Sequence, residues 1–170
     1  MDKSLIRRTP EERYEIHDLL RQYAAEKLHE HPQEKEKTQE HHCEYYAAFV
    51  QQKVKHLKQD QQKEALTTIS TEIENVRTAW KQAVSQGREE DIEKFVIGLY
   101  QFYDIRSWFQ EALAVSSQAI LSLQTVFGSV DQIAGRKAVI LGYLLSRKGW
   151  FSYRLGLSEQ AKAFLQKSLP

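Results

Sequence analysis

Residues that break helices are scarce in this chain, which holds 7 glycines and 3 prolines among its 170 residues. Good helix formers, namely Glu, Gln, Lys, Leu and Ala, dominate the remainder. The sequence therefore predicts a mainly α-helical fold.

Apolar residues recur at steps of three and four along most of the chain, which is the period of an amphipathic helix. We expect a first helix over 17–31 and a series of further helices joined by short connections. Their expected ranges are 33–58, 66–83 with a stop at Gly87, 89–106, 108–126, 131–154 and 158–169. Short connections join antiparallel neighbours, so these segments are expected to form the helix hairpins of a bundle or an α-solenoid.

The N-terminal end differs from the rest. Residues 4–8 and 13–16 are short extended-looking runs, and the segment 9–12 between them contains Pro10, which favours a type I turn. The sequence predicts a β-hairpin here. Since an isolated hairpin is only marginally stable in water, we expect an upstream domain to have been cut away.

Composition excludes several classes of protein. The net charge is +1, from 24 basic and 23 acidic residues, which argues against a polybasic nucleic-acid binder. A single cysteine, Cys43, excludes a disulfide framework and fits a cytoplasmic protein. The longest apolar run, 138–145, is far shorter than the roughly 20 residues that cross a bilayer, so no membrane partner is expected.

Five glycines stand seven residues apart, at positions 128, 135, 142, 149 and 156. We expect Gly135, Gly142 and Gly149 to share one helix face, where a closely packed neighbour offsets the roughly 1 kcal/mol that glycine costs in a helix. Gly128 and Gly156 are expected at loop ends. Chance spacing is the alternative.

Two helix pairs line up at a spacing of 49 residues. The corresponding positions are Tyr103, Ala112 and Ala119 in one pair and Ser152, Ala161 and Ser168 in the next. Small residues recur at two of these places, both on the second helix, where close packing against the first helix demands them. This pattern resembles tetratricopeptide units, although their usual period is 34. Because a solenoid ends in a polar capping helix, a chain that ends at Pro170 directly after a helix is expected to be truncated.

The N-terminal segment carries a second resemblance. Residues 2–8 (DKSLIRR) and 13–24 (RYEIHDLLRQYA) resemble the end of the winged-helix domain of STAND-class signalling ATPases, the NB-ARC relatives, which include AfsR-like and MalT-like bacterial regulators. In that family the wing hairpin leads into a helix that opens with a hydrophobic-His-Asp signature, here residues 16–18. Residues 74–80 (ENVRTAW), and then Phe102, Tyr103, Arg106, Glu111 and Ala112, are similar to the first tetratricopeptide-like helices of the bacterial members.

This second resemblance implies two domains: residues 1–31 as the C-terminal hairpin and helix of a winged-helix domain, and residues 32–170 as a truncated tetratricopeptide-like domain. It implies a regulatory role, in which an upstream nucleotide-binding domain is one partner and a protein, peptide or small effector binds the helical surface. In the full-length parent, His17 would reach an ADP phosphate in the autoinhibited state, which exchange for ATP would release. Alternatively, His17 and Asp18 cap the helix.

This chain has no Gly-x-x-x-x-Gly-Lys-Ser/Thr loop, so we expect it to be neither an enzyme nor a carrier of ADP or ATP on its own. A different interpretation is a free-standing tetratricopeptide-like scaffold with no nucleotide partner. A winged-helix DNA-binding protein is a third, which the balanced charge does not favour.

Aromatic residues next to arginines are the candidates for partner binding, because such clusters mark interface hot spots. The candidates are Tyr100, Tyr103, Arg106, Trp108, Trp150, Tyr153 and Arg154. Core packing is the alternative for the rings, and nucleic acid is not expected at a net charge near zero. A zinc site is not expected either, because the consecutive residues 41–43 (HHC) point about 100° apart on a helix.

Overall fold

The computed structural model describes residues 6–8, 14–128 and 133–168, and it is mainly helical, as expected. The chain divides into two compact units, Met1–His41 and His42–Pro170. The division lies inside helix α2 (Pro32–Leu57), whereas the sequence placed a domain boundary between residues 31 and 32. Within the described ranges, no helix combines the length and apolar character that a membrane span needs.

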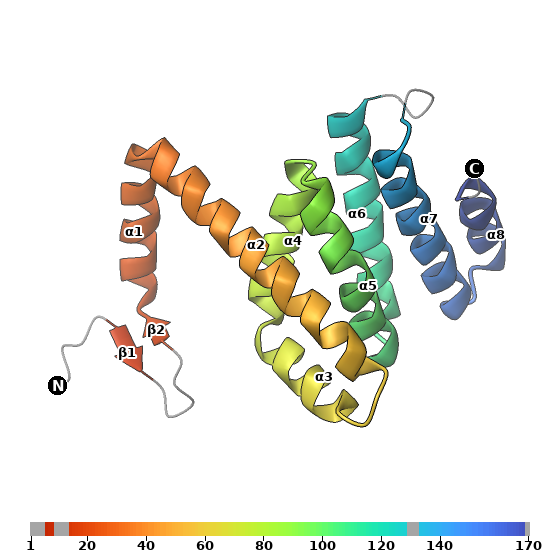
Figure 1. The fold of residues 1–170 in the computed structure, drawn as a ribbon, viewed down its shortest axis with the longest axis horizontal. Helices are drawn as coiled ribbons and strands as arrows, with labels where there is room; N and C mark the ends of the chain where they lie inside the picture. Colours follow the sequence, from red (N-terminus) through yellow and green to blue (C-terminus); the bar gives the residue numbers. More distant parts are fainter. Residues whose placement is uncertain (1–5, 9–13, 129–132, 169–170) are drawn as a thin grey trace. The chain divides into compact units, whose positions relative to one another are not determined.

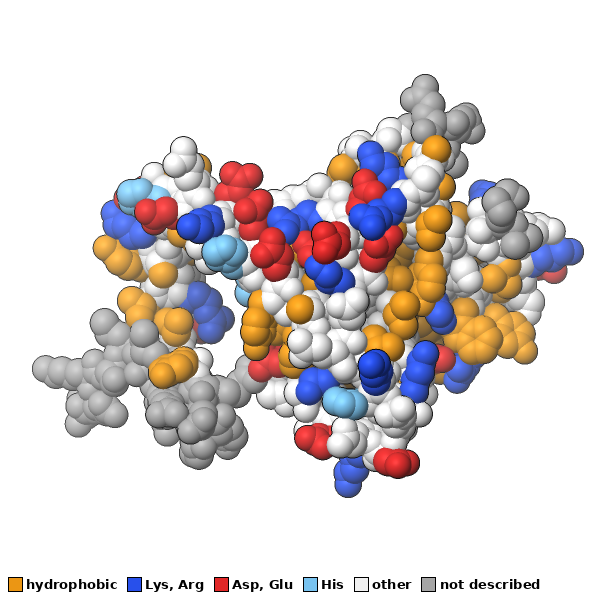
Figure 2. Space-filling view, viewed as in Figure 1, with side chains coloured by type: hydrophobic (Ala, Val, Ile, Leu, Met, Phe, Trp, Pro, Cys, Tyr) orange, Lys and Arg blue, Asp and Glu red, His pale blue; other side chains and the backbone are white. Residues whose placement is uncertain are grey.

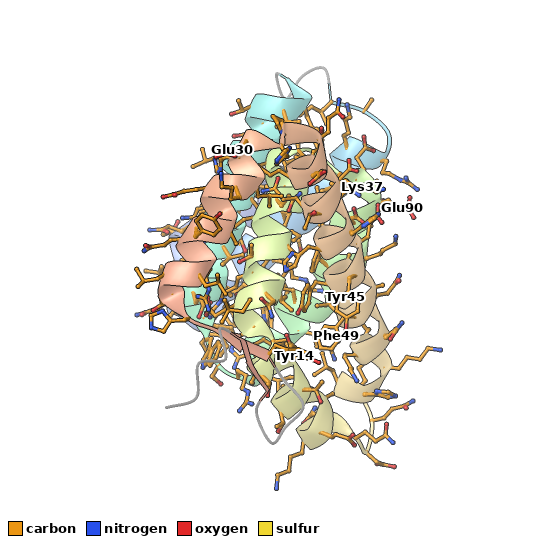
Figure 3. All side chains as sticks on the ribbon, turned by 90° about the vertical axis from the view of Figure 1, so that its left-hand side faces the viewer. Tyr14, Glu30, Lys37, Tyr45, Phe49 and Glu90 are labelled. Atoms are coloured by element: carbon orange, nitrogen blue, oxygen red, sulfur yellow. The ribbon has the colours of Figure 1, made fainter. Side chains whose placement is uncertain are left out.

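The first unit begins with two short strands, β1 (Ile6–Arg8) and β2 (Tyr14–Ile16), which pair antiparallel with Ile6 opposite Ile16 (Figure 1). They fall within the two runs expected to be extended. The expected turn at 9–12 and residues 2–5 of the family resemblance lie outside the described residues. Helix α1 (Asp18–Glu30) follows and buries none of its side chains (Figure 3).

The second unit contains the C-terminal part of α2 and six further helices among the described residues. These are α3 (Gln62–Thr71), α4 (Ile73–Ser85), α5 (Glu89–Ile105), α6 (Phe109–Phe127), α7 (Arg136–Arg154) and α8 (Ser158–Lys167). Helices next to each other in sequence contact one another from α3 to α8, and so do α4 with α6 and α5 with α7 (Figure 1). This arrangement of hairpins side by side is consistent with an α-solenoid.

Helix α5 forms the centre of the core. Its buried side chains include Ile92, Phe95, Leu99, Phe102 and Tyr103. On the face toward α2, a Cβ atom at Gly98 would lie 2.9 Å from the carbonyl oxygen of Val50. Gly98 therefore lets α5 approach the α2 backbone more closely than any larger residue would.

The prediction of a single helix over 66–83 is wrong. The structure has two helices there, α3 and α4, which meet at Glu72. Three hydroxyls of α3 (Thr67, Thr68 and Thr71) donate to carbonyls four residues earlier, which weakens and bends a helix. The Glu72 carboxylate then accepts 2.8 Å hydrogen bonds from Tyr46 and Asn75. These contacts hold the break in place.

The turns α4–α5, α5–α6 and α7–α8 close with the same backbone hydrogen bond, from the residue after the turn to a carbonyl five positions earlier. The donor and acceptor pairs are Arg88 to Ala83 at 2.9 Å, Trp108 to Tyr103 at 3.0 Å and Leu157 to Ser152 at 2.9 Å. The residue before each donor has a positive φ: Gly87 at 62°, Ser107 at 59° and Gly156 at 78°. The two glycine turns were expected. Nothing in the sequence marked Ser107 as a residue of left-handed conformation.

Helix α7 begins at Arg136 rather than at residue 131. The expectation that Gly135, Gly142 and Gly149 share one helix face is therefore corrected. Gly135 precedes the helix with a φ of +62°, so the expected face keeps only Gly142 and Gly149. A Cβ at Gly149 would lie 2.8 Å from Cγ of Leu165 in α8, and one at Gly142 would lie 3.2 Å from the Ser168 carbonyl. Both glycines therefore allow the close approach of α8.

Candidate functional site

Arg154, in the last turn of α7, occupies the centre of an aromatic cluster. Its guanidinium donates through Nη1 to Oδ1 of Asp104 in α5 at 2.8 Å. The same group lies over two rings, 4.3 Å from the centroid of Phe109 and 5.6 Å from that of Trp150. An ion pair and two cation–π contacts therefore fix one side chain.

The indole of Trp150 shares the same carboxylate oxygen. Its Nε1–H donates to Oδ1 of Asp104 at 3.2 Å, so Asp104 joins α5 to α7 through two side chains. The ring centroids of Trp150 and Tyr153 lie 6.1 Å apart. Trp150 remains 38% exposed and Tyr153 61% exposed.

We call these five residues, Asp104, Phe109, Trp150, Tyr153 and Arg154, the aromatic–arginine surface. Figure 2 shows hydrophobic side chains gathered at the C-terminal end of α7, with charged side chains beside them. Aromatic rings that are held rigidly and left partly exposed lose little conformational freedom on binding, which is the usual property of interface anchors. The arrangement suits recognition of another molecule.

Two of the predicted partner-binding residues, Tyr100 and Tyr103, belong to the core instead. Both rings are buried, between 0 and 1% exposed. Burial raises the pKa of Tyr103 to about 12, and it raises the pKa of Tyr100 as well. Their assignment to an exposed surface is corrected, because the amphipathic face of α5 turns both rings toward neighbouring helices.

Two further candidates, Arg106 and Trp108, lie at the α5–α6 turn and contact other partners. Arg106 donates through Nη2 to the hydroxyl of Ser70 at 2.7 Å. Trp108 packs under the guanidinium of Arg77, 5.8 Å from the ring centroid. Their contacts therefore lead to α3 and α4, whereas Trp150, Tyr153 and Arg154 lie with Asp104.

Sequence reasoning did not single out Asp104. An acidic residue in the last turn of a helix is disfavoured by the helix dipole, and this position was the available signal that a cation lies opposite. Arg154, which supplies the cation, is 50 residues further along the chain, so the pairing is tertiary.

In the first unit, His17 is the N-cap of α1. Its Nδ1 accepts a hydrogen bond from the backbone N–H of Leu19 at 3.3 Å. The cap alternative named His17 and Asp18 together, and in the structure His17 supplies the bond while Asp18 lies in the first turn. With Nδ1 as acceptor, a neutral imidazole carries its proton on Nε2.

Cys43 and the histidines do not form a ligand set in the part of the chain that the structure describes, where no three metal-binding side chains converge. The Cys43 thiol is buried and donates to the carbonyl oxygen of Ala79 at 3.5 Å. Burial, together with the charge of Asp91, raises the pKa of Cys43 to about 11. A thiol in this environment stays protonated and unreactive at neutral pH.

Two of the sequence-predicted features thus remain candidates for recognition: the aromatic–arginine surface of the second unit, and the capped His17 of the first. Comparisons of the chain with protein-family models, with curated proteins and with solved structures give no match.

Proposed function

We propose that this chain is the regulatory and sensor part of a STAND-type signal-transduction ATPase, and that its helical unit recognises a protein, a peptide or a small effector. The observation that carries the recognition role is the aromatic–arginine surface. Arg154 is held by Asp104 and Phe109 while Trp150 and Tyr153 stay exposed. A partner that covers Trp150 gains apolar contact without having to order that ring first, because Asp104 already holds its indole N–H.

The N-terminal unit supports the link to a nucleotide switch. The resemblance at 13–24 coincides with a strand, β2, that leads into a helix capped by His17. Because Nδ1 is engaged by Leu19, the remaining Nε2–H is a donor suited to a phosphate oxygen, next to the positive end of the helix dipole. In this proposal the upstream nucleotide-binding domain of the parent holds the ADP or ATP, and the chain itself acts in the cytoplasm without catalysis.

The test is calorimetric titration of ADP into a longer protein that includes the upstream domain. Relative to the unsubstituted protein, His17→Ala is expected to weaken ADP binding at least about tenfold, or about 1.4 kcal/mol. The matched control is His17→Ser, because serine is a good N-cap but its hydroxyl is too short to replace an imidazole at a phosphate. Equal losses in both variants support a phosphate contact, whereas a loss in His17→Ala alone assigns His17 to capping.

A free-standing tetratricopeptide-like scaffold is the second candidate. It is favoured by the extended core of the helical unit, which lies wholly within residues 42–170. Lack of ADP binding by the longer protein, with the helical unit still folded, would leave this candidate in place of the first.

A further inference from the structure

A groove runs along the line where α4 and α6 pack together in the second unit, and none of the aromatic–arginine surface residues lines it. Its volume is about 550 Å³, within the range of natural binding sites. Apolar side chains form its floor, chiefly Trp80 and Val84 from α4 and Val115 from α6. Trp80 is nearly fully buried and packs edge-on against Phe95, which makes this floor rigid.

One end of the groove carries a net negative charge. Arg77 forms ion pairs with Glu74 of its own helix and with Glu111 of α6. Two carboxylates against one guanidinium leave about one unit of negative charge at this end. Glu74 keeps 80% of its side chain exposed, so its carboxylate can still accept bonds from a partner.

A basic side chain lies further along the groove. Lys81 lines the groove, is exposed, and has no carboxylate partner among the described residues. It lies seven residues after Glu74 on α4, which is two helical turns, or about 10 Å along the axis. The groove therefore presents an acidic end and, two turns away from it, an exposed lysine beside the apolar residues Trp80 and Val84.

We infer that the α4–α6 groove binds an amphipathic helix of a partner protein. The charges on that helix are complementary to the groove: a basic residue meets Glu74 and Glu111, and an acidic residue about seven positions away meets Lys81. Its apolar stripe lies over the half-buried Val115 and over the edges of Trp80 and Val84 that stay exposed.

A helix fits this site better than an extended segment does. The furrow between two packed helices accepts the ridge of a third. Two helices offer no free backbone edge, so an extended peptide on an apolar floor would leave its N–H and C=O groups unpaired, whereas a helix satisfies them internally. This inference rests on the groove alone and does not depend on the nucleotide switch.

The experiment uses the chain as it stands and a dye-labelled, alanine-based peptide of about 18 residues, long enough to be helical. The peptide carries leucines on one face, with a lysine and a glutamate seven positions apart beside them. Fluorescence anisotropy is expected to show saturable binding that weakens about tenfold with Lys81→Glu. A second peptide, in which that glutamate is replaced by lysine, is expected to restore the affinity of the Lys81→Glu protein.

Lys162→Glu is the control protein, because it makes the same charge change as Lys81→Glu at an exposed residue of α8 that does not line the groove, and it should bind the peptide unchanged. A scrambled peptide of the same composition should bind at least about tenfold more weakly. Equal binding of the scrambled peptide, no binding of either peptide, or a loss of affinity in Lys162→Glu as large as that in Lys81→Glu would each overturn the inference. Circular dichroism of each variant shows that the fold is retained.

Discussion

The hairpins α5–α6 and α7–α8 have the same type of turn. They fill the space between their two helices in opposite ways. In α7–α8 the first helix supplies Gly149 and the second supplies Leu165, whose Cγ would lie 2.8 Å from a Cβ at Gly149. The corresponding residues of α5–α6, 49 positions earlier, are Tyr100 and Ser116. Both are buried, so the bulky residue has moved from the second helix to the first.

The comparison teaches that the volume at this crossing is shared by a pair of residues. A small residue on one helix is needed only where its neighbour is large, because the interior is close-packed. A sequence search for a small residue at the Gly149 position of the first helix therefore detects α7–α8. It misses the equivalent packing in α5–α6, where the small residue, Ser116, is on the second helix. One place where both hairpins keep a small, buried residue is the pair Ala112 and Ala161.

The strongest test removes the bulky member of the α5–α6 pair. Tyr100→Ala is expected to lower the free energy of unfolding by about 3–5 kcal/mol, because it leaves a cavity beside Ser116. Tyr100→Phe is the matched control and should be nearly neutral, since the Tyr100 hydroxyl is buried without a well-formed hydrogen bond among the described residues. Urea denaturation measures both variants, and similar losses for the two would contradict a packing role.

A second test uses pH, because α5–α6 holds buried tyrosines where α7–α8 holds Gly149 and Ser152. Burial raises the pKa of Tyr103 from 10.0 to about 12. Because the pKa of Tyr103 is higher in the folded state than in the unfolded state, the protonated phenol stabilises the folded protein. This contribution to the free energy of unfolding is fully present below pH 10 and is lost as the pH rises through about 12.

The free energy of unfolding is expected to fall by roughly 2 kcal/mol for this group over that range. Tyr103→Phe should make the decline shallower, although Tyr100 still contributes in the same direction. Urea denaturation at pH 9 and pH 11 provides the measurement. An unchanged decline in Tyr103→Phe would show that another group causes it.

The glycine of the α7–α8 pair offers a third test. Gly149→Ala places a Cβ against Leu165 and the Ala161 carbonyl, and it is expected to destabilise the protein by about 1–2 kcal/mol. In a Leu165→Ala background the same change should cost less, because the two side chains then fit together as small residues. Thermal or urea unfolding of the four proteins gives the coupling, and strictly additive effects would count against the shared-volume account.

The smallest expected effect concerns the turns. Ser107 has a φ of 59° in the α5–α6 turn, and Gly156 occupies the corresponding position of the α7–α8 turn. Ser107→Gly should stabilise the protein by about 0.5–1 kcal/mol, and Gly156→Ser should destabilise it by a similar amount. No atom lies within 4 Å of a Cβ at Gly156, so its variant reports backbone strain alone. Midpoints of thermal unfolding that move in the same direction for both variants would contradict this explanation.

Much of the helical fold is readable from the sequence because the apolar period is local. The period places α5, α6 and α8 within a few residues, and glycine marks the turns at 87 and 156. The break at Glu72 is not readable, since it depends on threonine hydroxyls and on Tyr46, which is 26 residues away. The late start of α7 depends on the conformation of Gly135, which a periodic pattern does not reveal.

The candidate site is readable only in part, for the same reason. Trp150, Tyr153 and Arg154 stand three and four residues apart on one helix, so their proximity follows from sequence. Asp104 joins them through tertiary contacts. Aromatic composition alone does not distinguish a buried ring such as Tyr103 from an exposed one such as Tyr153, because that depends on which face the neighbouring helices cover.

The repeated turn has a consequence for how this chain folds. In each of the three turns, a backbone N–H just after the turn donates to a carbonyl five residues earlier, near the end of the preceding helix. A hairpin therefore needs no distant segment to close its turn. Contacts of such short sequence separation form quickly, and folding can begin in any hairpin and spread to its neighbours. For the same reason, the array can gain or lose a whole hairpin at a turn while the remaining hairpins keep their internal bonds.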